Sequence, residues 1–511
     1  MAALSWFMSI DVKRPLLAVA LVAALAACGA QEPVAQAPLR VVTPYSVKSL
    51  DPIKQGFWAS GWGYGELLMR STESGTVEPW LLAALTRQGE SAWTLTLRQG
   101  VRFQSGRALD AAALKELMDA HLAGNPAVRA ALEGAKVTVA GPLAVRLETE
   151  GPVANLPSLL ADESMFSVFD VASGTFTGPF EVKSLDSRKL VLAGDPDYWG
   201  GKVRLDGVEV RFVPDGQART LAVRSGEADL AFYPPTDALR TLKGDARVSV
   251  REAALATGQL RGFLNVRKAP LDDSRVRRAL SLAVDRKELA ETVMDGFYRT
   301  PSGVYPEALP YSVKNLRTDL AAAERLLEQA GWRKGADGTR TKDGRPLAIT
   351  INAYSPQPDT KPLAVAMQAQ LAKAGFRAEV AEVPENYAAM RSADGWDVGL
   401  SFDGSLSYGF DPVAPLAQMM RTKGPRNLGG IADSGLDAVI DELAGAFEPA
   451  ERDRLLREAQ RIAVDEQAYH LIVVDRVPRV VAGPRYRDYR PSSVLLHLDA
   501  TTGPCGASCG S

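Results

Sequence analysis

A serine near the C-terminus is the first residue whose surroundings match a catalytic pattern. Gly506-Ala-Ser-Cys-Gly510 fits G-x-S-x-G, in which a preceding strand and a following helix expose the serine hydroxyl as a nucleophile. Only Ser511 follows the motif here, so we expect no helix and no nucleophile. Gly61-Trp-Gly-Tyr-Gly65 lacks the spacing of a dinucleotide-binding loop. We predict no catalytic residues and no cofactor, with paired carboxylates left open as acid–base groups.

Histidine and cysteine side chains are the candidate metal ligands. His121, His470 and His497 are far apart in the sequence, whereas metals such as zinc need three or four grouped ligands. Cys505 and Cys509 lie in a Gly/Ser-rich tail without an adjacent His or acidic residue, and we interpret this tail as structurally unimportant. The sequence therefore predicts no direct metal site. A chelated metal held by aromatic and Arg side chains is the alternative.

Composition limits the class of protein. The 511 residues are 46% hydrophobic, and 59 Lys and Arg stand against 61 Asp and Glu. A chain of this length can bury the cores of two or more lobes and is too apolar to be disordered. A net charge of −2 does not provide the surplus of positive charge that binding to nucleic acid requires, so we expect no nucleic-acid partner.

Residues 1–27 have the pattern of an export signal. The basic pair Lys13-Arg14 precedes an uncharged run that is too short to span a membrane and typical of a signal-peptide core. The run ends in Leu25-Ala-Ala-Cys28, which resembles the lipobox of bacterial lipoproteins. We expect a lipid on Cys28 that anchors the exported protein to a membrane, followed by a flexible tether over 28–38. An ordinary secretory signal is the alternative.

Strands and helices alternate along the rest of the chain, which favours α/β lobes with mixed sheets. The alternating residues 93–98 predict a half-buried strand, and Asp110 is placed to cap a helix that ends near Leu122. Apolar residues at helical spacing predict helices over 273–294, 318–330, 363–374, 434–447 and 450–468, and apolar runs predict strands over 347–353, 376–383 and 471–474.

Four stretches resemble the bacterial extracellular solute-binding proteins of family 5, which bind peptides, opines or nickel for ABC importers. They are Trp93–Gly106, Thr177-Gly-Pro-Phe180 with Asp197-Tyr-Trp-Gly-Gly201, Arg224–Leu230, and Leu264–Arg286. The last is similar to the family signature N-x-x-x-x-P-[FL]-x-D-x-R-V-R-x-A-[LI] followed by A-[IV]-D-R. We expect these motif residues mainly to hold the fold, for example with Asp273 as a helix cap.

The resemblance implies an α/β, two-lobe periplasmic-binding-protein fold of class II, similar to cluster C, with an extra subdomain in the first lobe. We expect lobe I with the inserted subdomain over 39–262, lobe II over 263–485, a return to lobe I over 486–504 and a tail over 505–511. It also implies a monomeric substrate-binding lipoprotein of the periplasm or cell surface that works with ABC permease and ATPase subunits. The alternatives are a chemoreceptor or sensor partner of the same fold and a hydrolase.

The solute is expected to contact a loop of lobe II, Leu400–Pro412. Peptide-binding members carry an aspartate in this loop that holds the ligand's amino group. In this sequence only Asp411-Pro412 clearly matches the loop of those members, and Asp403 and Tyr408 lie at other positions of the loop. Because burying an unpaired ammonium group costs several kcal/mol, we expect an opine-like or metal-chelate solute, or a peptide held through its backbone. The alternative is an ordinary peptide whose amino group is bound by Asp403 or Asp411.

Aromatic side chains are the other candidate ligand contacts, because planar rings suit a mostly apolar pocket. We predict that Tyr45, Trp58 and Trp62 face Tyr408 and Phe410 across the cleft, with Tyr64 and Trp80 as further candidates and Arg421 or Arg426 available for a ligand carboxylate.

Overall fold

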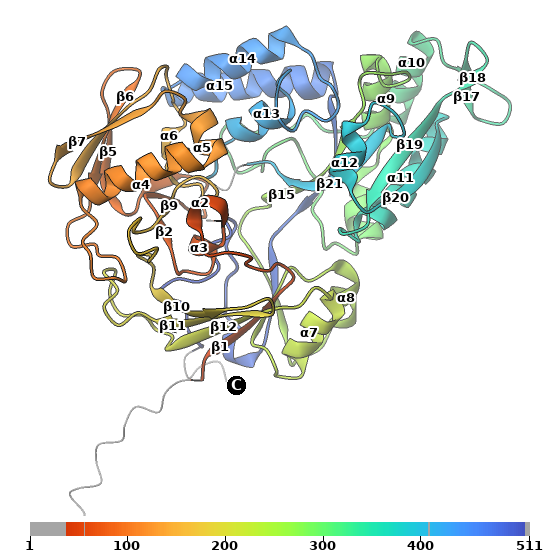
Figure 1. The fold of residues 1–511 in the computed structure, drawn as a ribbon. Coiled ribbons are helices and arrows are strands. Elements are labelled where there is room, and N and C mark those ends of the chain that lie inside the picture. Colours follow the sequence, from red (N-terminus) through yellow and green to blue (C-terminus); the bar gives the residue numbers. More distant parts are fainter. Residues whose placement is uncertain (1–36, 56, 407–408, 506–511) are drawn as a thin grey trace, which may run out of the picture.

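The computed structural model describes residues 37–505, except residues 56, 407 and 408. Lobe I is built on a seven-stranded sheet in the order β10-β11-β12-β1-β13-β23-β14, at the bottom of Figure 1. Leu39, Val41 and Val42 of β1 are fully buried in it. Its strands are β1 (Leu39–Thr43), β10 (Phe180–Leu185), β11 (Lys189–Gly194), β12 (Gly207–Phe212), β13 (Leu230–Phe232), β14 (Ser249–Glu252) and β23 (Arg479–Ala482), and α7 (Gly216–Arg224) and α8 (Thr236–Thr241) follow β12 and β13.

The inserted subdomain has a four-stranded sheet, β5-β6-β8-β7, covered by α4 and α5. The predicted strand is β6 (Ala92–Leu97), whose burial alternates, and the predicted helix is α4 (Ala111–Gly124), whose Ala113 N donates to Asp110 Oδ1 at 2.9 Å. Both predictions are confirmed. The other elements of the subdomain are β5 (Leu82–Arg87), β7 (Lys136–Gly141), β8 (Ala144–Glu148) and α5 (Pro126–Ala131). The elements that lie toward lobe I are α2 (Pro52–Gln55), α3 (Phe57–Gly61), β2 (Glu66–Leu67), β3 (Met69–Ser71), β4 (Val77–Pro79), α6 (Leu156–Leu160) and β9 (Ser167–Val168).

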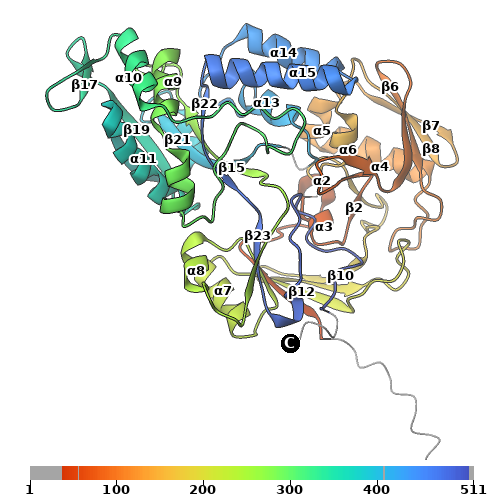
Figure 2. The ribbon, with the colours of Figure 1, turned by 180° about the vertical axis from the view of Figure 1, so that it is seen from behind.

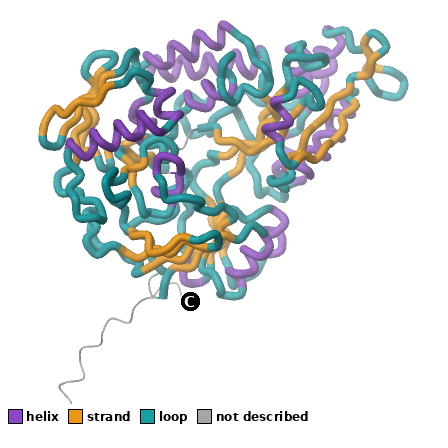
Figure 3. The backbone as a smooth tube through the Cα atoms, in the orientation of Figure 1, coloured by secondary structure: helices purple, strands orange, loops and turns teal. Residues whose placement is uncertain are grey.

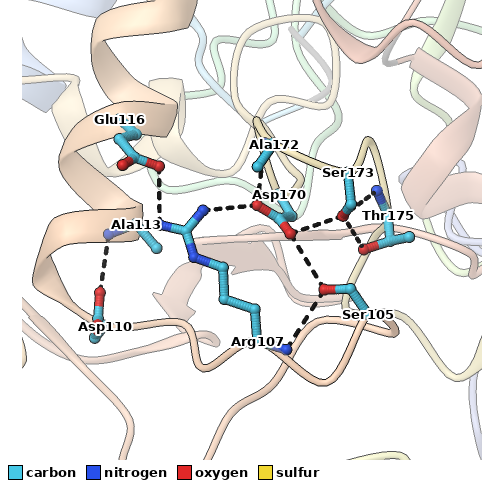
Figure 4. A network of polar contacts seen from close by, with 9 residues as sticks. All are labelled: Ser105, Arg107, Asp110, Ala113, Glu116, Asp170, Ala172, Ser173 and Thr175. Carbon is cyan, nitrogen blue, oxygen red and sulfur yellow. Dashed lines mark hydrogen bonds and ion pairs between the residues drawn. The ribbon is translucent and has the colours of Figure 1, made fainter.

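A polar network connects the segment after β6 to the segment after β9 (Figure 4). Asp170 accepts hydrogen bonds from Arg107 Nη1 at 2.8 Å, Ser105 Oγ at 3.1 Å and Ser173 Oγ at 2.7 Å. Arg107 also pairs with Glu116 of α4 at 2.9 Å. These bonds lower the pKa of Asp170 despite the opposing effect of its burial. The end of the motif over 93–106 thus has a structural role.

Lobe II is built on a five-stranded sheet, β20-β19-β21-β15-β22, on the right of Figure 1. Its strands are β15 (Gly258–Leu264), β19 (Ala348–Tyr354), β20 (Arg377–Val383), β21 (Val398–Gly404) and β22 (His470–Arg476). The helices α9 (Ser274–Ala283), α10 (Leu320–Gln329), α11 (Thr360–Ala374) and α12 (Asn386–Arg391) pack around it, and β16 (Arg333–Lys334), β17 (Arg340–Lys342) and β18 (Arg345–Pro346) form a small separate sheet.

The single helix predicted over 273–294 is wrong, because the chain breaks after α9. Val284 is extended, and a π-helix, Glu288–Val293, follows. The buried Arg286 side chain donates to the carbonyl oxygens of Ser281 at 3.0 Å and Ile472 at 2.7 Å. The guanidinium group thus bonds to carbonyls at the end of α9, which satisfies groups that helix ends leave free.

A helical layer lies between lobe II and the subdomain. It contains α13 (Val413–Met419), α14 (Ser434–Gly445), α15 (Pro449–Gln460) and the π-helix Arg461–Glu466, while a 3-10 turn, Pro484–Tyr486, follows β23. Figures 2 and 3 show α14 and α15 side by side at the top of the molecule. Ala154 N donates to Ala444 O at 2.9 Å, which links this layer to lobe I. No helix within the described residues is both long and apolar enough to cross a membrane.

The chain crosses between the two large sheets in two places. It leaves lobe I after β14 at Glu252 and enters β15 at Gly258, and it returns between Arg476 and Arg479. The sequence placed these boundaries later, after residues 262 and 485. The difference arises because β15 and β23 continue the apolar strand pattern across each boundary, so hydrophobicity does not mark the change of sheet.

Candidate ligand-binding site

A cavity of about 750 Å³ lies between the lobes, a volume within the usual range for small-molecule sites. The two crossing segments contribute Thr257 and Val477 to its wall. Other wall residues come from lobe I, including Tyr45, Trp58, Arg219, Thr236 and His497, and from lobe II, including Tyr298, Asp359, Phe402, Asp403, Phe410, Arg426 and Arg476.

Two of the predicted aromatic residues of lobe I line this cavity. Tyr45 is 47% exposed, and its ring stacks on Trp58 with centroids 5.9 Å apart. Trp62 lies behind Trp58 at 6.1 Å and is 0% exposed, packed against Phe232. Trp62 is therefore a core residue that supports Trp58.

Tyr64 and Trp80 also lie outside the cavity wall. Tyr64 is buried against Phe176. The buried carboxylate of Glu66 accepts a hydrogen bond from Trp80 Nε1 at 2.9 Å. The same carboxylate accepts hydrogen bonds from Tyr198 Oη at 2.6 Å and from Trp199 Nε1 at 2.8 Å. Burial raises the pKa of Glu66, and these donors oppose the increase.

The predicted loop of lobe II brings Phe410 to the cavity, while Tyr408 lies outside the described residues. Asp411 is 1% exposed. It accepts hydrogen bonds from Asn155 Nδ2 of lobe I at 2.7 Å, Arg452 Nη2 at 3.1 Å and Val413 N at 2.9 Å. Asp411 thus holds the loop that carries Phe410 against lobe I.

Asp403 lines the cavity and is ion-paired. Its carboxylate pairs with Arg426 and accepts a hydrogen bond from Tyr387 Oη at 3.1 Å. Burial lowers the pKa of Arg426, but the charge of Asp403, the Tyr387 hydroxyl and the hydrogen bonds to both side chains together outweigh burial and raise this pKa. Burial, helped by the same carboxylate, raises the pKa of Tyr387 to about 12. Two predicted ligand contacts, Asp403 and Arg426, therefore neutralise each other, and Arg421 pairs with Asp441.

The three histidines lie in separate environments. His497 is on the cavity wall, its Nε2 atom lies 3.2 Å from Tyr233 Oη, and burial lowers its pKa to about 3. His470 is buried with a pKa near 3 for the same reason, and His121 Nε2 lies 2.9 Å from Ser167 O. Within the described part of the chain, no three His, Cys, Asp or Glu side chains are grouped as metal ligands.

Sequence reasoning missed most of the polar residues of the wall, among them Arg219, Tyr298, Asp359 and Arg476. Arg219 is buried and donates to four carbonyl oxygens, including Phe232 O at 3.2 Å and Tyr233 O at 2.7 Å, so it fixes the wall beside Tyr45. Asp359 follows β19, which is parallel to β20 and β21. Ligands commonly bind beyond the carboxyl ends of parallel strands, and this signal could have found Asp359.

Two lobes, joined by two crossing segments and closing over one cavity, define a solute-binding protein. The sequence matches bacterial extracellular solute-binding proteins, family 5 Middle, over residues 76–427. The chain therefore belongs to this family, whose members are non-enzymatic solute-binding subunits of ABC transporters.

Known proteins resemble the chain over most of its length. The nickel-binding periplasmic protein of Escherichia coli (strain K12) is 28% identical over 484 residues, covering 87% of this chain and 91% of that protein. Glutathione-binding protein GsiB of Salmonella paratyphi A is 24% identical and covers 75% and 78%. The crystal structure of NikA from Brucella suis with Fe(III)-EDTA superposes with a TM-score of 0.82 at 24% identity, over 92% of this chain and all of that one. This last likeness confirms the two-lobe α/β fold.

Proposed function

We propose that this chain captures one small solute between Trp58 of lobe I and Phe410 of lobe II and delivers it to an ABC permease. The observation that carries this proposal is the cavity lined by both lobes and by both crossing segments. Polar contacts join the two lobes: Thr236 Oγ1 donates to Asp359 at 2.9 Å, and Asn155 donates to Asp411 at 2.7 Å.

The solute class we propose is peptide-like, opine-like or a metal chelate. Because Asp403 is paired with Arg426, it does not offer a free carboxylate to a peptide's amino group. The names of relatives include nickel-binding, glutathione-binding and D,D-dipeptide-binding proteins, and one solved relative holds Ni(L-His)2. These are polar solutes of a size that suits the cavity.

We further propose that the mature chain is held at a membrane by a lipid on Cys28. This cysteine lies outside the described residues, and the proposal rests on the lipobox in the sequence. Cys28 stands 11 positions before Leu39, the first residue of β1. A chain of this length spans at most about 35–40 Å, which leaves lobe I close to the membrane surface.

A thermal-shift screen tests the binding proposal. A solute that binds only the folded protein at a hundredfold excess over its Kd stabilises it by about 2.7 kcal/mol. Short peptides, opines and nickel–histidine complexes form the panel, with mass spectrometry of each solute afterwards. We expect one class to raise Tm without being converted, and steady conversion to a product would contradict a binding role.

A further inference from the structure

Two charged side chains that lobe II contributes to the cavity wall have no ion-pair partner among the described residues. They are the carboxylate of Asp359 and the guanidinium of Arg476, both on lobe II. The other wall charges have partners. Asp403 pairs with Arg426, and Arg479 pairs with Glu252 at 2.7 Å. Arg219 donates to four carbonyl oxygens, and Asp162 accepts hydrogen bonds from backbone N–H groups. Both side chains are half-buried, and a partly buried charge without a partner costs free energy unless a ligand compensates it.

One oxygen of Asp359 is fixed, and the other is free. Oδ2 accepts hydrogen bonds from Tyr298 Oη at 2.6 Å and from Thr236 Oγ1 of lobe I at 2.9 Å, while Oδ1 has no hydrogen-bond partner in the described part of the chain. Asp359 also precedes α11 at its N-terminus without capping it through its side chain, and a helix N-terminus favours negative charge there. The lobes therefore orient a carboxylate whose second oxygen remains available.

The guanidinium group of Arg476 lies over an aromatic ring. Its guanidinium carbon is 4.6 Å from the centre of the Phe402 ring, and within the described residues its N–H groups have no hydrogen-bond acceptor. The Tyr298 ring stacks on the same Phe402 ring at 5.4 Å. Phe402 and Tyr298 thus connect Arg476 to Asp359 along one wall, and no ion pair joins the two charges to each other.

We propose that Asp359 and Arg476 form a binding subsite for a zwitterionic solute. An ammonium group donates to Asp359 Oδ1, a carboxylate accepts two hydrogen bonds from Arg476, and the solute's apolar part spans the cavity between the two charges. A solute that carries both charges compensates both side chains together, whereas a solute of one sign leaves the other side chain unpaired. This inference rests on the proposed solute-binding function and makes Asp359, in place of the loop residue Asp403, the acceptor of an amino group.

Calorimetry with end-blocked probes tests the subsite. The probes are alanine and its di-, tri- and tetrapeptides, each with free ends, with an acetylated amino group or with an amidated carboxyl group. We expect a free-ended probe to bind, and blocking either end to weaken it roughly ten- to hundredfold, as loss of a charged hydrogen bond does. Asp359→Asn should remove the preference for a free amino group, and Arg476→Gln the preference for a free carboxyl group.

Asp441→Asn is the control, because it changes a carboxylate that is already ion-paired, with Arg421, and that lies outside the cavity wall. Both preferences should persist in this variant. The blocked probes give the same test on the unaltered protein if Asp359→Asn does not fold. The inference is overturned if blocked and free-ended probes bind equally, or if no free-ended probe binds. If either outcome occurs but a blocked probe or nickel–histidine binds, the proposed solute-binding function is still supported and only the subsite is wrong.

Discussion

Gly409 of lobe II lies directly against the carbonyl oxygen of Ser158 in lobe I. A Cβ atom at position 409 would lie 2.0 Å from Ser158 O and 3.1 Å from Asp162 N, far inside van der Waals contact. The closed arrangement of the lobes therefore requires glycine here, next to Phe410 on the cavity wall.

Gly409→Ala should prevent full closure. We expect weaker solute binding and a larger radius of gyration in the presence of solute, measured by small-angle X-ray scattering, because the methyl group holds α6 and the loop apart. The free energy of unfolding of each lobe should change little. Gly151→Ala is the matched control, because nothing lies within 4 Å of a Cβ atom added at Gly151. Gly395→Ala is less suitable, because Gly395 has a positive φ.

Trp58 and Trp62 should respond differently to truncation. Trp58→Ala removes a wall residue, so we expect a loss of about 1–3 kcal/mol in solute affinity, as for a central aromatic anchor. Trp62→Ala empties a fully buried site and should lower the free energy of unfolding by about 3–5 kcal/mol. Calorimetry and urea unfolding on both variants separate the two effects, and an equal effect on affinity and stability in both would contradict the assigned roles.

Glu66→Ala should destabilise the fold without touching the cavity. Two Trp N–H groups and one Tyr O–H group would lose their acceptor, and each buried donor left unsatisfied costs about 1–3 kcal/mol. Glu78→Ala breaks only an exposed pair with Arg70, worth less than about 1 kcal/mol. Thermal unfolding of both variants checks this difference, and similar Tm values would contradict it.

His497 should make stability depend on pH. Burial lowers its pKa to about 3 in the folded protein, against about 6.5 in the unfolded chain. The unfolded state therefore binds the extra proton first, and the stability present above pH 6.5 is lost as pH falls toward 3. Relative to His497→Gln, the parent should lose about 1.4 kcal/mol per pH unit below pH 6. Urea unfolding at pH 7.5, 6 and 5 measures this, and a constant difference between the two proteins would contradict a buried neutral histidine.

Cys28→Ser should release the protein from the membrane fraction, because lipid chains supply the anchoring energy. Cell fractionation with an immunoblot checks the distribution. A variant that is processed but remains with the membrane would contradict lipidation at Cys28.

Local patterns explain what the sequence could predict. The Asp110 cap and the alternation in β6 depend on neighbouring residues, so periodicity was sufficient to place α4 and β6. The break at Val284 depends on carbonyl contacts of Arg286 that include Ile472 in a distant strand, and helical periodicity continues through it. Local pattern alone therefore could not show where α9 ends.

The site was less predictable than the fold because its residues meet only after the lobes form. Asp403 is paired with a residue 23 positions away, and Asp359 is oriented by Thr236, 123 positions away in the other lobe. No spacing rule connects such residues. Trp58 and Trp62 show the same limit, because their residue type does not indicate which ring faces the cavity.

The most direct test of a binding role is calorimetry with the solute that most raises Tm, followed by mass spectrometry of the recovered solute. We predict one solute per chain, an unchanged solute mass, and affinity weakened by about 1–3 kcal/mol, or roughly 5- to 150-fold, by Trp58→Ala and by Phe410→Ala. Conversion of the solute, or unchanged affinity in both variants, would contradict capture between these two walls.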